Sequence, residues 1–177
     1  MDIEKFISAS LGQWRSQRSA HHLAFGHFEQ VTSTIKIEPL TKDDSEVIAL
    51  CKTYNVDPTV AATPFRMSWE GESDWDDDET FSGTTILVPV PDANDVKKGK
   101  LLRDQGYAET ISSAGEYHFD QDGAFVLETA YERAAAEERI WFANPNFRMR
   151  VSLIKTSGGS GVVTASFSSE IRAEVPS

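Results

Sequence analysis

The residues with the clearest chemical potential are arginines and tryptophans, which gather in two parts of the sequence. Near the start, QWRSQRSAHH at residues 13–22 holds a tryptophan, two arginines and two histidines without an acid. Near the end, EERIWFANPNFRMRVSL at residues 137–153 holds two glutamates, three arginines and a tryptophan. Guanidinium groups present planar, paired donors to carboxylates, and indole rings present flat faces for stacking. Together these residue types could form a pocket for a flat, anionic small molecule.

Strand parity predicts which of these side chains can meet, because alternate residues of an extended strand share a face. In the first segment one face carries Trp14, Ser16, Arg18, Ala20 and His22, while Arg15 has the opposite parity. In the second segment a turn at residues 144–146 is expected to fold two strands together. That fold brings Glu138 near a face made of Arg148, Arg150 and Ser152. In the last strand candidate, Glu170 shares its face with Ser166, Ser168 and Arg172.

Two orientations of the second segment remain open on the sequence alone. Met149 and Val151 alternate with Arg148 and Arg150, and ordinary alternation would place the apolar side chains inward and the arginines in water. The opposite orientation gives an arginine-lined interior, with the outer apolar face covered by helices or by a partner. That orientation needs an anionic ligand to neutralise the buried charge.

The composition describes one globular domain and excludes several classes of protein. With 177 residues, 40% of them hydrophobic, the chain suits one sizeable core, so we expect a single domain over residues 1–177. A net charge of −11 offers no dense basic face for nucleic acid. No apolar run approaches the roughly 20 residues of a membrane span. The start, MDIEKFISAS, is unlike a secretory signal, so we expect a cytoplasmic location.

Common catalytic and metal-binding patterns are incomplete in this sequence. The run SDWDDDETFSG has Glu79 where a calcium loop needs glycine, and Thr85, two residues after the run, stands where the loop needs glutamate. His21 and His22 are neighbours on a strand and point to opposite faces, so we expect no three-histidine metal site. The single cysteine, Cys51, lies on the apolar stripe of a short helix and is predicted to be a core thiol. No GxSxG nucleophile motif occurs.

The elements that must position these residues are mostly short strands. Residues 2–11 are a predicted helix, and so is the segment TKDDSEVIALCKTYNVDP, with Thr41 as its N-cap and its end before Pro58. Alternation between turn signals predicts strands at residues 14–24, 28–38, 64–74, 81–89, 100–109, 113–119, 124–130, 133–143, 146–155 and 162–173. About ten strands joined mostly by hairpins predict a mostly β fold. We expect a closed antiparallel barrel that can hold one small ligand, with a sandwich as the alternative.

Five stretches of the sequence resemble the S-type (CpcS/CpeS) phycobiliprotein lyases: WRSQRSAHHLAF, SWEGESDW, TTILVPVPD, LLRDQGYAE and EERIWFANPNFRMRVS. The similarity spans nearly the whole chain. It implies a lipocalin-like antiparallel barrel with an N-terminal helix, which holds a bilin, a linear tetrapyrrole, as its bound substrate without a separate cofactor. It further implies delivery of that bilin, phycocyanobilin or phycoerythrobilin, to a cysteine of an apo-phycobiliprotein subunit.

The resemblance also implies a set of site residues. Carried over by motif, they are Glu138, Glu170 and Arg148 as catalytic residues, and Arg18, Trp69, Trp75, Arg148, Arg150, Ser152 and Trp141 as bilin-binding residues, with Arg15 as the weakest candidate. Arginines would bind the propionates, carboxylates would accept from the pyrrole nitrogens, and indoles would stack on the rings. In the implied reaction an acceptor thiol adds to the ethylidene group of ring A. A buried carboxylate would hold the protonated, more electrophilic ring system.

Two other functions stay open on the sequence. The chain could be a bilin carrier that promotes no chemistry, or a partner subunit of a heteromeric lyase, since some members of the family act as pairs of unlike chains. The sequence names neither the bilin nor the acceptor, and it leaves open a homodimer or a heterodimer with a related lyase subunit.

Overall fold

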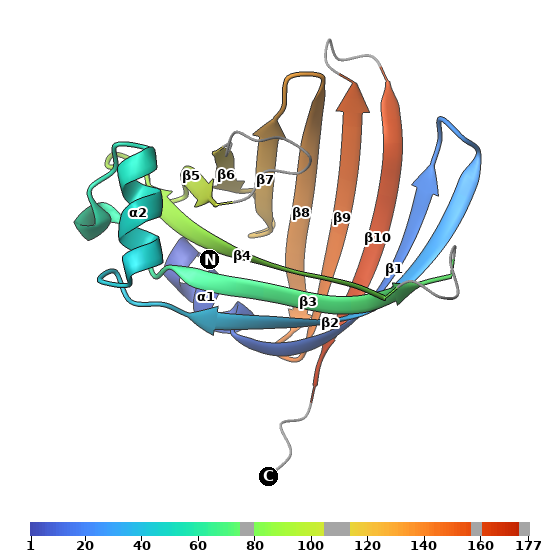
Figure 1. The fold of residues 1–177 in the computed structure, drawn as a ribbon, viewed down its shortest axis with the longest axis horizontal. Helices are drawn as coiled ribbons and strands as arrows, with labels where there is room; N and C mark the ends of the chain where they lie inside the picture. The colour runs from blue at the N-terminus through green and yellow to red at the C-terminus, as the bar shows by residue number, and fades with distance from the viewer. Residues whose placement is uncertain (75–79, 105–113, 157–160, 174–177) are drawn as a thin grey trace.

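Ten antiparallel strands form a closed barrel in the computed structural model, which describes residues 1–74, 80–104, 114–156 and 161–173 (Figure 1). Around the barrel the strands follow the order β1-β10-β9-β8-β7-β6-β5-β4-β3-β2. Each strand pairs with its neighbours in sequence, and β10 returns to pair with β1 and close the sheet. The predicted fold class, a mostly β closed antiparallel barrel, is confirmed.

The strands lie where the alternation predicted them. They are β1 (Gly12–His22), β2 (His27–Pro39), β3 (Phe65–Ser73), β4 (Thr80–Pro91), β5 (Lys98–Arg103), β6 (Gly115–Phe119), β7 (Phe125–Ala130), β8 (Ala134–Asn144), β9 (Phe147–Thr156) and β10 (Val162–Arg172). The predicted strand ends that fall within the described residues differ from these bounds by no more than two residues. Two predicted ends, at residues 109 and 113, lie outside the described residues.

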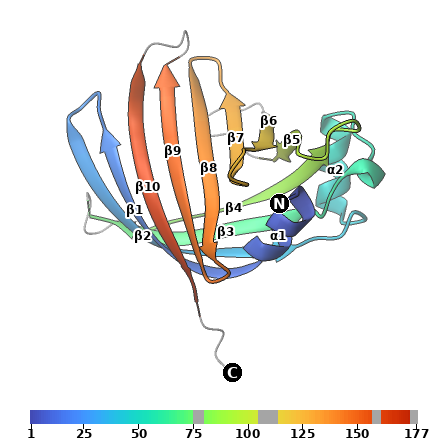
Figure 2. The ribbon, with the colours of Figure 1, turned by 180° about the vertical axis from the view of Figure 1, so that it is seen from behind.

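Helix α1 (Ile3–Ser10) lies within the curve of the sheet and forms where the sequence predicted it (Figure 2). The carboxylate of Asp2 caps the helix by accepting from the backbone N–H of Lys5 at 2.9 Å. The buried face of α1 includes Phe6, whose ring stacks on Phe125 of β7 with centroids 4.4 Å apart. Phe119 of β6 meets the same ring edge-on. An aromatic cluster therefore fixes α1 to the inner wall of the barrel.

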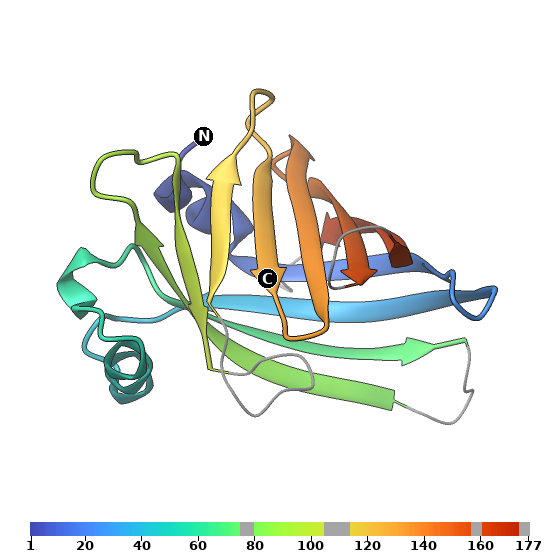
Figure 3. The same cartoon turned by 90° about the horizontal axis from the view of Figure 1, so that it is seen from above.

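Helix α2 (Ser45–Thr53) packs on the outside of the barrel, beside β4 and β5 (Figure 3). Its buried face meets Ile86 and Val88 of β4, while Leu87 between them belongs to the inner core. Both faces of β4 are thus covered, which accounts for its continuous apolar run ILVPV. Among the described residues, no helix has the length and apolar character that crossing a membrane requires.

The predicted start of α2 at Thr41 is wrong. The N-cap is Asp44, whose carboxylate accepts from the backbone N–H of Glu46 at 2.9 Å. Asp44 directly precedes the helical turn, whereas residues 42 and 43 form a separate turn of their own. The helix ends at Thr53, and a short 3-10 helix, η1 (Pro58–Val60), leads on to β3.

Cys51 lies on the buried face of α2 and has no exposed surface. Burial raises the pKa of its thiol, with Asp57 adding a smaller effect of the same sign. Since the thiolate is the reactive form, this thiol is poorly placed to act as a nucleophile. The prediction of a core thiol is confirmed.

We expect Phe6→Ala to lower the free energy of unfolding by about 3 to 5 kcal/mol, because it removes a buried ring from a packed aromatic cluster. Phe6 is 7% exposed, whereas Phe25, in the β1–β2 turn, is 84% exposed and serves as the control. Phe25→Ala should change the free energy by less than about 0.5 kcal/mol. Urea unfolding of both variants measures the difference, and equal losses would contradict the packing role of α1.

Candidate functional site

The barrel encloses a cavity of about 460 Å³. This volume falls within the range of roughly 300 to 1,000 Å³ that is usual for small-molecule sites. Part of the wall is apolar and includes the buried face of α1. The rest is charged: among the described residues, four arginines and three glutamates line the cavity, namely Arg18, Arg103, Arg148, Arg150, Glu29, Glu138 and Glu170. A ligand here would meet apolar surface and paired charges together.

The arginines of β9 face the inside of the barrel. Arg148, Arg150 and Ser152 line the cavity, while Met149 and Val151 face the other side of the strand and are half-buried. The ordinary alternation, with the arginines in water, is therefore wrong for this strand. The physical reason lies in the neighbouring strands, which supply carboxylates opposite the guanidinium groups.

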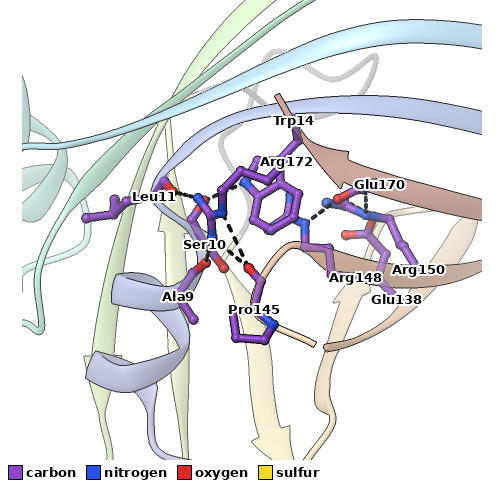
Figure 4. Close-up of polar contacts among 10 residues, drawn as sticks. All are labelled: Ala9, Ser10, Leu11, Trp14, Glu138, Pro145, Arg148, Arg150, Glu170 and Arg172. Atoms are coloured by element: carbon purple, nitrogen blue, oxygen red, sulfur yellow. Dashed lines mark hydrogen bonds and ion pairs between the residues drawn. The ribbon is translucent and has the colours of Figure 1, made fainter. Parts of the chain in front are cut away.

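Glu170 of β10 is the carboxylate on which both arginines converge (Figure 4). Nε of Arg148 donates to Glu170 Oε2, and both side chains are only 1% exposed. Nε of Arg150 lies 3.2 Å from Glu170 Oε1. Arg150 Nη1 also donates to Glu138 Oε1 at 3.3 Å. We call these four side chains the arginine–glutamate network. Because the protein neutralises its own buried arginines here, a ligand is not needed for that purpose, which corrects the expectation from sequence.

Strand register brings the network together. In the β9–β10 pair Arg148 lies directly opposite Glu170. In the β8–β9 pair Glu138 lies opposite Ser152, whose Oγ donates to Glu138 Oε1 at 3.4 Å. Directly opposed side chains on one sheet face have Cβ atoms about 5 Å apart, which suits an ion pair. The predicted approach of Glu138 to the arginine face is confirmed.

The charges of the network stabilise one another. Burial alone would raise the pKa of Glu170, but the guanidinium groups of Arg150 and Arg148 hold it below its usual value of 4.5. Burial lowers the pKa of Arg148 to about 10, against the opposing effect of Glu170. At neutral pH the carboxylate and the guanidinium groups are therefore charged together.

Trp14 joins the network to α1. Its ring is fully buried between two guanidinium groups, with Cζ of Arg148 4.7 Å and Cζ of Arg172 4.3 Å from the centroid. Trp14 Nε1 donates to the backbone oxygen of Ser10 at 2.8 Å, at the end of α1. Arg172 donates to the backbone oxygen of Leu11 at 2.6 Å (Figure 4). The tryptophan of the QWRSQR stretch is thus a packing residue beneath the cavity wall.

A second polar cluster forms where β1, β2 and β3 lie side by side. Glu29 lines the cavity, and its carboxylate accepts from Ser73 Oγ at 2.7 Å and lies 2.8 Å from His22 Nε2. Burial would raise the pKa of Glu29, but the hydrogen bonds with Ser73 and His22 lower it overall. Arg18, also on the cavity wall, adds a smaller effect in the same direction.

Trp69 offers its indole to the cavity from β3. It lies directly opposite Gly83 of β4, and a Cβ at position 83 would overlap the six-membered ring of the indole. A side chain larger than hydrogen at Gly83 would therefore push Trp69 from its place. The small residue on β4 is what lets the ring lie flat against the sheet.

The structure brings most of the sequence-predicted site residues to one cavity. Its wall includes Arg18, Trp69, Glu138, Arg148, Arg150, Ser152 and Glu170. Trp75 lies outside the described residues. Trp141 does not line the cavity, because it lies one residue out of phase with Ile140 and contacts Arg139 on the outer face, 5.2 Å from its Cζ. Arg15 is exposed, as its parity predicted.

Two charged residues of the wall were missed in the sequence, Glu29 and Arg103. Glu29 sits in a strand with a mixed burial pattern, and only its contacts with His22 and Ser73 on the two neighbouring strands reveal it. Arg103 follows Leu101 at the spacing of two that puts residues on one strand face. That parity was a usable signal, since Leu101 belongs to the inner core.

We expect Glu170→Gln to lower the free energy of unfolding by about 3 to 5 kcal/mol at neutral pH, because it leaves a buried guanidinium group without a full counter-charge. The control is Glu46→Gln, which breaks the exposed pair with Arg66, 2.5 Å apart. That pair should contribute less than about 1 kcal/mol. Equal losses in urea unfolding would contradict the central role of the buried pair.

The same comparison has a pH dependence with a definite sign. The folded-state pKa of Glu170 lies below its ordinary value, so its contribution is present above the unfolded pKa and lost as the pH falls through the folded one. The difference in stability between the native protein and the Glu170→Gln variant should therefore shrink below about pH 4. Unfolding curves recorded from pH 7 downward check this.

Comparison with known proteins gives a consistent result. The model of the CpeS-like protein family matches residues 2–173. The chromophore lyase CpcS/CpeS 3 of Trichodesmium erythraeum is 62% identical over 97% of this chain and 99% of its own length. The phycocyanobilin lyase subunit CpcS of Picosynechococcus is 42% identical over 92% of this chain and 83% of its own.

A solved structure adds the fold to this likeness. The S-type phycobiliprotein lyase CpeS from Guillardia theta superposes with a TM-score of 0.88 at 50% identity, over 99% of this chain and 95% of that one. Both the sequence match and the barrel cover nearly the full chain. The protein with the arginine–glutamate network inside its barrel therefore belongs to the CpeS-like family of S-type phycobiliprotein lyases.

Proposed function

We propose that the protein binds a linear tetrapyrrole in its cavity and promotes thioether attachment of that bilin to a cysteine of an apo-phycobiliprotein subunit. One observation carries the proposal. Among the described residues, three of the four cavity arginines have a buried nitrogen without a hydrogen-bond partner: Nε of Arg18 and Arg103, and Nη2 of Arg148. Buried donors nearly always have partners in folded proteins. The carboxylates of a bilin would supply the acceptors.

The chemistry of a bilin suits the rest of the wall. Its two propionates match guanidinium donors, and its pyrrole-type rings match the indole of Trp69 and the apolar surface that α1 provides. A tetrapyrrole whose charged groups met only apolar wall would lose their hydration without compensation. The names of the relatives, a chromophore lyase and a phycocyanobilin lyase subunit, support the same class of ligand.

The two network carboxylates have different tasks in this proposal. Both oxygens of Glu170 lie at ion-pair distance from arginines, and its side chain is 1% exposed, so Glu170 positions Arg148 and Arg150. The side chain of Glu138 is 30% exposed and meets its partners at 3.3 and 3.4 Å. Such long contacts leave acceptor capacity for pyrrole N–H groups. Glu138 is thus the carboxylate that would hold the protonated ring system.

The reaction is an addition with no leaving group. The sulfur of the acceptor cysteine bonds to the exocyclic carbon of the ring A ethylidene group, and the ring carbon at the other end of that double bond gains the proton. A carboxylate beside the nitrogens favours the cationic bilin, which draws electrons from the ethylidene carbon. The cavity also holds the bilin in one pose, so the thiol meets one face. Cys51, which is fully buried, has no part in this step.

A carrier or partner-subunit role is the second candidate, and one observation favours a partner. Phe167 and Ile171 on the outer face of β10 are 45% and 58% exposed, and neither helix covers them, since α2 packs on β4 and β5. One relative bears the name lyase subunit. We propose that the protein works as a homodimer or beside a related subunit, which sedimentation of the chain alone and with such a subunit can distinguish.

Incubation with phycocyanobilin or phycoerythrobilin and an apo-phycobiliprotein should give bilin that stays on the acceptor after acid-urea treatment. The lyase itself should lose its bilin under the same treatment, because its one cysteine is fully buried. Bilin that binds the protein but never becomes acid-stable on any acceptor would favour the carrier. Activity that needs a second chain would favour the partner subunit.

We expect Glu138→Gln to slow attachment on the order of 100-fold, while changing the dissociation constant for bilin much less, because the carboxylate acts mainly on the cationic state. The matched control is Glu137→Gln. Glu137 is the neighbouring residue on β8, does not line the cavity, and pairs with Lys155 at 3.1 Å. Single-turnover formation of the adduct separates the two variants, and equal rates would remove Glu138 from the mechanism.

A further inference from the structure

We propose that Arg103, at the end of β5, binds one carboxylate of the bilin and forms an anion subsite apart from the arginine–glutamate network. This assignment rests on the proposed function and extends it to a residue outside the set of site residues that the sequence predicted. Arg103 lies on the cavity wall with Leu101 from its own strand and Leu87 from the strand opposite.

The guanidinium group of Arg103 forms one hydrogen bond within the protein and has a further donor without a partner. Its Nη2 donates to Thr129 Oγ1 of β7 at 3.1 Å, and Thr129 is 3% exposed. Its Nε is buried and has no hydrogen-bond partner among the described residues. One edge of the planar group is therefore anchored to a buried hydroxyl, while donor capacity remains for a second acceptor.

The four cavity arginines differ in their counter-charges. Arg148 and Arg150 each form ion pairs with glutamates of the network. Within the described part of the chain, neither Arg103 nor Arg18 has a carboxylate within the 4.0 Å of an ion pair. Arg18 and Arg103 are therefore the two cavity arginines that can still form an ion pair with a ligand. Such a pair is most favourable where the guanidinium group lies beside apolar wall, because little water is there to solvate it.

These two cations stand on different walls. Going round the barrel, β1 with Arg18 and β5 with Arg103 are separated by three strands, β2, β3 and β4, in one direction and by five in the other. A ligand with one carboxylate would satisfy one of them. A ligand with two carboxylates on flexible chains, as the two propionates of a bilin are, can satisfy both and is held from two sides, which restricts its rotation in the cavity.

The test combines a change in the protein with a change in the ligand. Arg103→Met removes the guanidinium group and its charge but keeps an unbranched, apolar side-chain stem. The control is Lys100→Met, which removes a charge from an exposed position of the same strand. Each protein is titrated with phycocyanobilin as the free diacid and as its dimethyl ester, and binding is followed by the red absorbance. Circular dichroism confirms that the barrel is intact.

We expect Arg103→Met to weaken diacid binding on the order of 10- to 100-fold and to leave diester binding nearly unchanged. Lys100→Met should change neither affinity. Equal weakening for diacid and diester would assign Arg103 to the shape of the cavity and overturn the subsite. Unchanged affinity for both ligand forms would overturn it too.

A failure of the proposed function looks different. If the native protein binds neither ligand form, the bilin proposal falls and the subsite with it. If Arg103→Met does not fold, Arg103→Lys replaces it, because lysine keeps the charge without the paired donors. That variant should lose several-fold in diacid affinity and nothing in diester affinity, and an equal loss for both forms would again overturn the assignment.

Discussion

A single carboxylate enclosed between two arginines is the interaction on which the rest of the cavity depends. Taking guanidinium groups out of water costs several kcal/mol each. Without Glu170, Arg148 would face inward from β9 with no paired carboxylate, and Arg150 would keep only its contact with Glu138. Because these arginines face inward, the alternation of side chains along β9 places Met149 and Val151 on its outer face. A well-packed apolar set of the same volume would stabilise a barrel about as well. The presence of charge here is therefore better understood as a feature for binding than as one for stability.

The network is mechanically joined to the rest of the barrel through Trp14. Its indole lies between the guanidinium groups of Arg148 and Arg172, and its N–H holds the last turn of α1. Arg172 binds the backbone oxygen of Leu11 just after that helix. The helix that covers the apolar part of the cavity and the charges that line its polar part are thus positioned by one stack of side chains. A substitution that displaces α1 is therefore expected to displace the arginine–glutamate network as well, and the reverse.

Some charged side chains of the cavity are paired with one another and others are not. This division suits a ligand that must be bound in one pose and also take part in a reaction. Glu170 is committed to its arginines, whereas Glu138 is partly exposed and loosely bonded. Among the described residues, no carboxylate lies within ion-pair distance of Arg18 or Arg103, and Nε of each is buried without a hydrogen-bond partner. Committed groups give a rigid wall, and uncommitted groups provide the contacts that a bound molecule can complete. The outer face of β10 is a separate surface, where the apolar side chains of Phe167 and Ile171 are exposed and could be buried by a partner.

The sequence by itself determined the elements and the residue types, because both depend on local patterns. Period-two alternation placed all ten strands, the apolar spacing of Ile3, Phe6 and Ile7 placed α1, and long motifs placed most of the site residues. The sequence left open which face of β9 lies inside the barrel, since alternation defines two faces without saying which one is inward. The tertiary structure decided this by setting Glu170 opposite Arg148 in a strand pair 22 residues apart in sequence. It also brought Glu29 to the wall, because closing the barrel joins strands that no local pattern connects. Once the inner face of each strand is known, parity places Arg103 on the wall and Trp141 outside.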